Sequence, residues 1–193
     1  MNPSSDGSLR YNVWVDINDS IVIQKWYPNG MGSQMLYDLH LILTTTEEIF
    51  NKTIRIGFRT IQLIEDNIQP KGTTFYFKIN GTPFYAKGSN WIPAHVFQEQ
   101  LSPNYIRHLL ESCRDANMNM LRVWGGGVYE SDLFYQIADE LGILIWHDFM
   151  FACALYPVHK QFLTSVREEV FQQVRRLQHH PSIALWAGIS SYI

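Results

Sequence analysis

From residue 84 onward, short apolar segments alternate with longer segments in which apolar residues recur at helical spacing. The short segments expected as strands are 84–87, 120–123, 143–146 and 183–186. Strand–helix alternation with short connections indicates a parallel sheet with right-handed crossovers. The second part of the chain is therefore expected to belong to a doubly wound sheet or to a (β/α)8 barrel.

The ends of three expected helices are well marked. Ser102 and Ser131 are placed to cap the first two helices, and Gly142 closes the second because glycine readily takes the left-handed conformation. The third helix runs through residues 162–177 and stops before Pro181. The three helices therefore lie between the four expected strands.

The turn after the first expected strand favours the barrel. A nucleotide-binding doubly wound sheet has a Gly-rich turn there, whereas this chain has Gly88-Ser89-Asn90-Trp91. Gly125-Gly126-Gly127 lacks the spacing of a phosphate loop and is interpreted as a flexible loop. We therefore expect residues 71–193 to form the first half of a (β/α)8 TIM barrel, about four βα units, truncated after strand four.

The first 70 residues have the pattern of antiparallel strands instead. Ile54, Ile56 and Phe58 alternate with polar or small residues, so one face of this strand is expected to be buried and the other wet. Farther on, Asn80-Gly81 favours a type I′ hairpin turn. Residues 1–70 are accordingly expected to form an incomplete immunoglobulin-like β-sandwich module.

The residues at the expected strand ends are suited to binding a sugar. The active site of a (β/α)8 barrel lies at the C-terminal ends of its strands, and here each end offers an indole. Aromatic faces stack on the apolar faces of sugar rings, while Asn, Asp and Arg side chains bond to hydroxyl groups. Core packing of the tryptophans is the alternative. The candidate substrate-binding residues are Asn90, Trp91, Arg122, Trp124, Trp146, Asp148 and Trp186.

Arg122 is the sharpest of these candidates because it lies inside an expected barrel strand. An arginine in that position is expected to be buried only if a carboxylate pairs with it. The other histidines and glutamates are not expected to form a site. His179-His180 precedes a proline and is interpreted as a solvated helix end, His147 has no second ligand nearby, and Glu130, Glu168 and Glu169 fall on helices or helix starts. We expect no metal and no cofactor.

Composition excludes two classes of partner. The net charge is -3 and no run of Lys or Arg occurs, which argues against nucleic acid and against an anionic membrane surface. Three glycosylation sequons, at Asn18, Asn51 and Asn80, favour a secretory or lysosomal route over the cytosol. The polar N-terminus, residues 1–8, lacks the charged start and apolar centre of a signal peptide.

Four long strings of residues resemble the family 2 glycoside hydrolases of the β-mannosidase type, in particular the animal lysosomal enzymes. The strings run from Trp26 to Tyr37, Ile79 to Pro93, Arg122 to Glu130 and Trp146 to Cys153. The resemblance implies hydrolysis of terminal, non-reducing β-mannose from oligosaccharides with retention of configuration, by an acid/base and a nucleophile glutamate at the ends of strands four and seven. It also implies that the candidate residues lie in or beside the mannose pocket, and that the parent enzyme is lysosomal.

The resemblance fails inside the strand-four motif. The family continues Trp-x-Gly-Asn-Asn-Glu, where the Glu is the acid/base, whereas this chain continues Trp186-Ala187-Gly188-Ile189-Ser190. Because neither catalytic glutamate is expected in the chain, we predict a fragment or truncated isoform that is inactive alone. A non-catalytic carbohydrate-binding fragment and a non-functional isoform are the alternatives.

Overall fold

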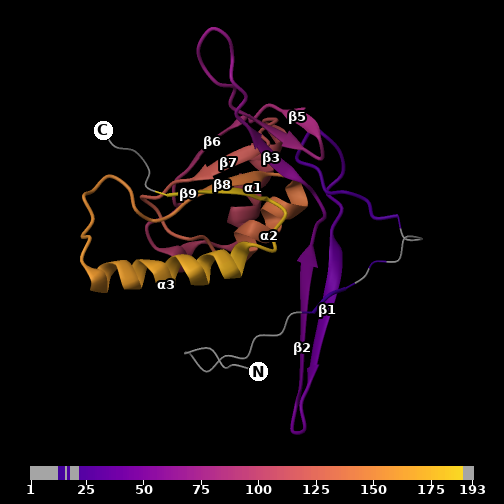
Figure 1. The fold of residues 1–193 in the computed structure, drawn as a ribbon. Helices are drawn as coiled ribbons and strands as arrows, with labels where there is room; N and C mark the ends of the chain where they lie inside the picture. The colour runs from indigo at the N-terminus through magenta and orange to yellow at the C-terminus, as the bar shows by residue number, and fades with distance from the viewer. Residues whose placement is uncertain (1–12, 16, 18–21, 189–193) are drawn as a thin grey trace.

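The structure, a computed structural model, describes residues 13–15, 17 and 22–188. A long antiparallel ribbon is followed by a small antiparallel sheet and then by a parallel sheet with helices (Figure 1). Among the described residues, no helix is both long and apolar enough to cross a membrane. In chain order the elements are β1 (Tyr37–Thr44), β2 (Ile49–Ile56), β3 (Ile61–Ile64), β4 (Tyr76–Ile79), β5 (Thr82–Phe84), β6 (Gly88–Trp91), the short 3-10 helix η1 (Gln98–Gln100), α1 (Pro103–Asp115), β7 (Met120–Val123), α2 (Asp132–Leu141), β8 (Leu144–Asp148), α3 (Lys160–Leu177) and β9 (Ile183–Ala187).

The four strands β6 to β9 form a parallel sheet in sequential order. Within the described residues this order shows no reversal of the kind that defines a doubly wound sheet. A helix or helical connection follows each of the first three strands, so the expectation of a parallel α/β unit is confirmed. The sheet is consistent with part of an α/β barrel.

The first strand of this sheet is not where the sequence placed it. Residues 84–87 were expected to form it, but Phe84 ends β5 and pairs antiparallel with Phe77. The parallel strand begins at Gly88, opposite Met120. A Cβ at Gly88 would lie 1.6 Å from the Met120 carbonyl oxygen, so only glycine allows this approach. Asn90 and Trp91 therefore lie within the strand rather than after it.

The helix ends lie close to where the sequence placed them, but the cap expected at Ser131 makes no side-chain hydrogen bond. The Ser102 side chain accepts a hydrogen bond from the Tyr105 N–H at the start of α1. Ser131 precedes α2 without a side-chain capping bond, and Gly142 closes that helix in the left-handed conformation, with φ of 72°. At the start of α3, the His159 ring accepts from the Phe162 N–H. Helix α3 ends four residues before Pro181, as expected.

The parallel sheet has an apolar cluster on each face. The cluster against the helices includes residues from α1 and α2, and the other joins the parallel sheet to the β3–β4–β5 sheet. Among its fully buried members, the helix-facing cluster contains Leu110, Phe134, Tyr135, Ile137, Ile143, Ile145 and Leu177. The opposite cluster consists of Trp26, Phe77, Ile79, Phe84, Met120 and Leu144.

The antiparallel strands form two separate sheets. The β1–β2 ribbon projects from the rest of the molecule (Figure 1), and Leu41, Ile42 and Phe50 are exposed on it. Strand β3 pairs with β4, so residues 61–84 form one three-stranded sheet that spans the predicted domain boundary at residue 70. The immunoglobulin-like sandwich stays a prediction.

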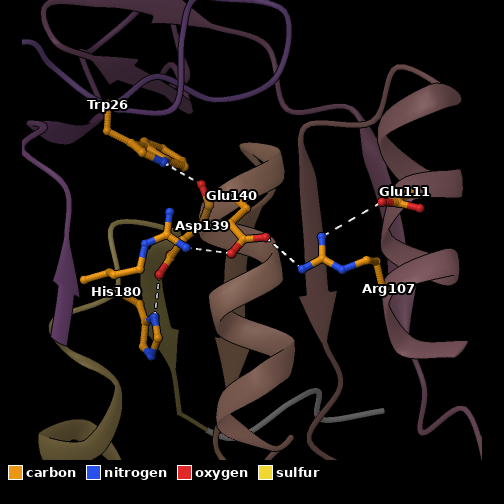
Figure 2. A network of polar contacts seen from close by, with 7 residues as sticks. Trp26, Arg107, Glu111, Asp139, Glu140 and His180 are labelled. Carbon is orange, nitrogen blue, oxygen red and sulfur yellow. Dashed lines mark hydrogen bonds and ion pairs between the residues drawn. The ribbon is translucent and has the colours of Figure 1, made fainter. Parts of the chain in front are cut away.

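A polar network joins helix α2 to Trp26, strand β2, helix α1 and the segment after α3 (Figure 2). The Trp26 indole N–H donates to the Asp139 carbonyl oxygen at 2.8 Å, and Nδ1 of His180 lies 2.5 Å from the Asp139 carboxylate. Glu140 pairs with Arg107 of α1 at 2.8 Å and with Arg55 of β2 at 2.6 Å. The interpretation of His180 as solvated was wrong, because its side chain is 4% exposed and contacts the buried carboxylate of Asp139.

Candidate functional site

The pairing of Arg122 with Asp148 is the main polar feature of the face opposite the helices. Nε and Nη2 of Arg122 lie 3.2 and 2.7 Å from the two carboxylate oxygens of Asp148, so the contact is bidentate. The Asp148 side chain is fully buried, whereas the Arg122 side chain is 35% exposed. The carboxylate therefore anchors a guanidinium group that still reaches the surface.

The strand register explains why these two side chains meet. Arg122 lies opposite Trp146 in the parallel pairing, and Asp148 follows two residues later on the same face. The Gly125 N–H also donates to Asp148 at 3.2 Å. A Cβ at Gly125 would lie 2.5 Å from the Phe149 carbonyl oxygen, so the glycine loop is packed tightly against this strand end. Arg122 was expected to be buried only with a carboxylate partner, and it has such a partner although its side chain remains 35% exposed.

Two more of the predicted residues lie on the same face. Asn90 lies opposite Arg122 in register and is exposed, and Trp146 lies opposite Arg122 on the other side. The Trp146 ring is half-buried, 6.4 Å from Phe75, and its N–H is buried without a hydrogen-bond partner among the described residues. Trp124 follows β7 directly, and its half-buried ring lies over Gly126.

The two remaining tryptophans belong to the other face. In the register, Trp91, Val123, His147 and Trp186 form one row across the four strands. Trp91 is 8% exposed, packs against Phe134 at 4.9 Å and donates its N–H to Glu130. Core packing is thus the better description of Trp91. Trp186 lies on the His147 ring, 4.8 Å away, and joins the helix-facing cluster.

Buried polar side chains occupy this helix-facing side, and the sequence did not reveal them. His147 is fully buried, with Nε2 2.7 Å from the Tyr135 hydroxyl and Nδ1 2.8 Å from the Asp148 carbonyl oxygen. Burial lowers the pKa of His147 to about 4, so the ring is neutral at pH 7. Burial also raises the pKa of Glu130, which is 2% exposed and fills a structural role. The available sequence signal for His147 was a polar residue within an otherwise apolar strand.

The three sequons differ in their surroundings. Asn51 is exposed on β2. The Asn80 amide is engaged, because its Nδ2 donates to the Trp26 carbonyl oxygen at 3.0 Å and its Oδ1 accepts from the Thr60 N–H at 2.9 Å. Asn18 lies outside the described residues.

The face of the parallel sheet opposite the helices, here called the site face, is suited to hydrogen bonding and stacking. The Arg122 guanidinium group and the Asn90 amide can bond to hydroxyl groups, and the half-buried indoles offer faces to an apolar surface. Among residues 13–15, 17 and 22–188, no three His, Cys, Asp or Glu side chains gather as a metal site requires. In the part of the chain that the structure describes, no glutamate directly follows any of the strands β6 to β9.

Known proteins resemble the chain along nearly its whole length, although no protein-family model matches it. It is similar to the β-mannosidase of Capra hircus, at 52% identity over 188 residues, which covers 94% of this chain and 21% of the goat protein. The Bos taurus β-mannosidase is 53% identical over 184 residues, with the same coverage of both chains. The crystal structure of the Dictyoglomus thermophilum β-D-mannosidase superimposes with a TM-score of 0.83 at 47% identity, over 86% of this chain and 20% of that one.

The chain thus spans about one fifth of the length of the relatives that it matches. At 50% identity and above over nine tenths of the chain, the match includes both the antiparallel strands and the parallel sheet. The chain is therefore a homologue of the β-mannosidases over the fifth of their length that it matches.

Proposed function

We propose that these residues form the sugar-binding side of a glycoside hydrolase that removes terminal, non-reducing β-mannose from oligosaccharides. The homology to proteins named β-mannosidases supports the substrate class. The bidentate Arg122–Asp148 pair is the observation that carries the proposal, because it presents a fixed guanidinium group at the end of a parallel strand.

In this proposal the fold is the first half of a (β/α)8 barrel, residues 71–193, preceded by an immunoglobulin-like module, residues 1–70. The sequential parallel strands and the Dictyoglomus thermophilum enzyme support the barrel. The exposed sequon at Asn51 and the animal relatives support a lysosomal location for the full-length protein.

The side chains of the site face divide the work of binding. Arg122 and Asn90 donate hydrogen bonds to ring hydroxyls, while the half-buried indoles of Trp124 and Trp146 offer the faces on which a pyranose stacks. Asp148 is too deeply buried to reach a sugar and instead fixes the guanidinium plane. Trp91 and Trp186 support the site from the far side of the sheet.

Hydrolysis needs two carboxyl groups that flank the glycosidic bond. No glutamate lies at a parallel strand end among the described residues, and the one carboxylate on the site face, Asp148, is paired with Arg122. We therefore propose that these 193 residues bind β-mannosides by themselves without cleaving them.

Calorimetric titration of the 193-residue chain with β-1,4-mannobiose tests the proposal. We expect saturable binding in the millimolar range, about 4 kcal/mol, and weaker binding of cellobiose, which differs at the C2 hydroxyl groups. Incubation with p-nitrophenyl β-mannoside should release no nitrophenol above the buffer rate. Absence of saturable heat would refute binding, and turnover would refute the assignment of a binding role alone.

A further inference from the structure

We propose that Tyr135 and His147 are positioning residues for the sugar site, acting from the opposite face of the sheet through the backbone of Asp148. The role in sugar binding rests on the proposed function. The contacts themselves do not depend on it, and they run from Tyr135 to His147, to Asp148 and to Arg122.

The first step is the protonation of His147. Its Nδ1 lies 2.8 Å from the Asp148 carbonyl oxygen, and a carbonyl only accepts hydrogen bonds, so Nδ1 carries a proton. In the neutral ring Nε2 is then an acceptor. The Tyr135 hydroxyl, 2.7 Å away, must donate to it. A single tautomer therefore satisfies both contacts.

The second step is the confinement of the ring. The Tyr135 and Tyr129 rings are stacked on His147 with centroids 5.8 and 5.6 Å away, and Trp186 lies 4.8 Å away. The imidazole is fully buried. Because packing fixes the plane of the ring and the Tyr135 hydroxyl fixes its rotation, Nδ1 is held toward the Asp148 carbonyl group.

The third step connects this contact to the sugar site. The Asp148 peptide is held by His147 on one side, and its carboxylate accepts from the Gly125 N–H and from Arg122 on the other. A bidentate contact depends on the plane of the carboxylate, so a small rotation of the Asp148 backbone would move the Arg122 guanidinium group. The buried pair thereby sets the position of a group that faces the sugar.

Tyr135 and Tyr129 provide a matched pair of substitutions. Both rings are stacked on His147, but the Tyr129 hydroxyl donates to Glu169 at 3.0 Å and not to His147. Tyr135→Phe removes only the hydroxyl that donates to His147, and Tyr129→Phe removes a hydroxyl from an equally placed ring. The readouts are the 15N resonances of the His147 ring, hydrogen exchange at Nε of Arg122, and the affinity for β-1,4-mannobiose.

In the unaltered chain we expect the His147 resonances of the Nδ1-protonated tautomer. Tyr135→Phe should shift the Nε2 resonance of His147 and accelerate hydrogen exchange at Nε of Arg122 at least about threefold. It should also weaken mannobiose binding about threefold to tenfold, the effect of roughly one hydrogen bond. Tyr129→Phe should leave the Nε2 resonance in place, and it should change the Arg122 exchange rate and the mannobiose affinity by less than about twofold.

Three results would overturn the inference. A His147 ring protonated at Nε2, measured in the unaltered chain, would contradict the first step. Equal Arg122 exchange in the two variants contradicts the connection across the sheet. Equal mannobiose affinities with unequal exchange contradict the positioning role. If the unaltered chain fails to bind mannobiose, the proposed function fails, while the tautomer and the exchange rates still test the contact chain.

Discussion

The two faces of the parallel sheet are built by the same strands but differ in character. Across β6, β7 and β8, one row of neighbours reads Asn90, Arg122 and Trp146, and the next row reads Trp91, Val123 and His147. The first row ends in side chains that reach the surface, and the second is buried against helices. Successive residues of a strand point to opposite faces, so a shift of one residue would exchange the site with the core.

The difference also shows that burial does not make a face apolar. The helix-facing side contains His147 and Glu130, each fully or almost fully buried and each with a hydrogen-bond partner. Polar groups there serve the geometry of the strands, whereas on the other face Arg122 and Asn90 are at least partly exposed and can meet a ligand, while the buried Asp148 holds Arg122.

The largest effect is expected in the helix-facing core. Phe134 is fully buried between Trp91 and Tyr135, so Phe134→Ala should lower the free energy of unfolding by about 4 kcal/mol. Phe97→Ala, at a ring that is 64% exposed, serves as the control and should change it by less than about 0.5 kcal/mol. Urea unfolding measures both. A similar loss in the two variants would show that the packing is misassigned.

The buried imidazole makes stability depend on pH. The pKa of His147 falls from its ordinary 6.5 to about 4 in the folded chain because of burial. Between these values the unfolded chain binds more protons, so stability is fully present above pH 6.5 and is lost as the pH falls toward 4. A difference of this size corresponds to about 3 kcal/mol. His147→Gln should remove that part of the slope in urea unfolding at several pH values, and an unchanged slope would contradict a buried neutral ring.

Asp148, which holds Arg122 on the site face, should contribute less to the free energy of unfolding. Asp148→Asn removes the charge that pairs with Arg122, and we expect a loss of about 2 kcal/mol because the guanidinium group keeps partial access to water. Asp115→Asn breaks an Arg–Asp contact of similar length, 2.8 Å, whose carboxylate side chain is 67% exposed. That control should cost less than about 0.5 kcal/mol. Thermal unfolding of both variants decides whether burial accounts for the difference.

The smallest effect concerns the sheet that covers one end of the site face. Asn80→Ala removes two hydrogen bonds to the backbone and should cost about 1 to 2 kcal/mol. Asn51→Ala, on the exposed ribbon, should cost less than about 0.5 kcal/mol. After expression in animal cells, glycosidase treatment should reveal a glycan at Asn51 and none at Asn80. A glycan on Asn80 would contradict the engaged amide, because Nδ2, the atom that would carry the glycan, is held in a part-buried bond to the Trp26 carbonyl oxygen.

Much of the fold could be predicted because its signals are local. Caps such as Ser102 and the left-handed Gly142 mark helix ends within a few residues, and the pairing of Arg122 with a carboxylate follows from the cost of an unpaired buried charge. The start of the first parallel strand was missed because it depends on how closely Gly88 approaches Met120, a contact 32 residues away in the sequence. His180 was misplaced for the same reason, since its partner Asp139 lies on α2, 41 residues away in the sequence.

Residues in the site were harder to predict than the strands that hold them. An indole near a strand end says nothing of the face that it occupies until the register is known, and the shift of the first strand changed the placement of Trp91. The sequence showed His147 only as a polar residue at the end of an apolar strand, and its contact with Tyr135 could not be predicted because it joins a helix to a strand.

Calorimetric titration of β-1,4-mannobiose into the unaltered chain, Arg122→Lys and Leu121→Met compares the two faces directly. Lysine cannot form the bidentate contact, so we expect Arg122→Lys to weaken binding about tenfold or more. Leu121→Met alters the helix-facing core at the residue next to Arg122, conserves side-chain volume and should bind within about twofold of the unaltered chain. Loss of binding in Leu121→Met with full affinity in Arg122→Lys would place the sugar on the wrong face and contradict the proposed site.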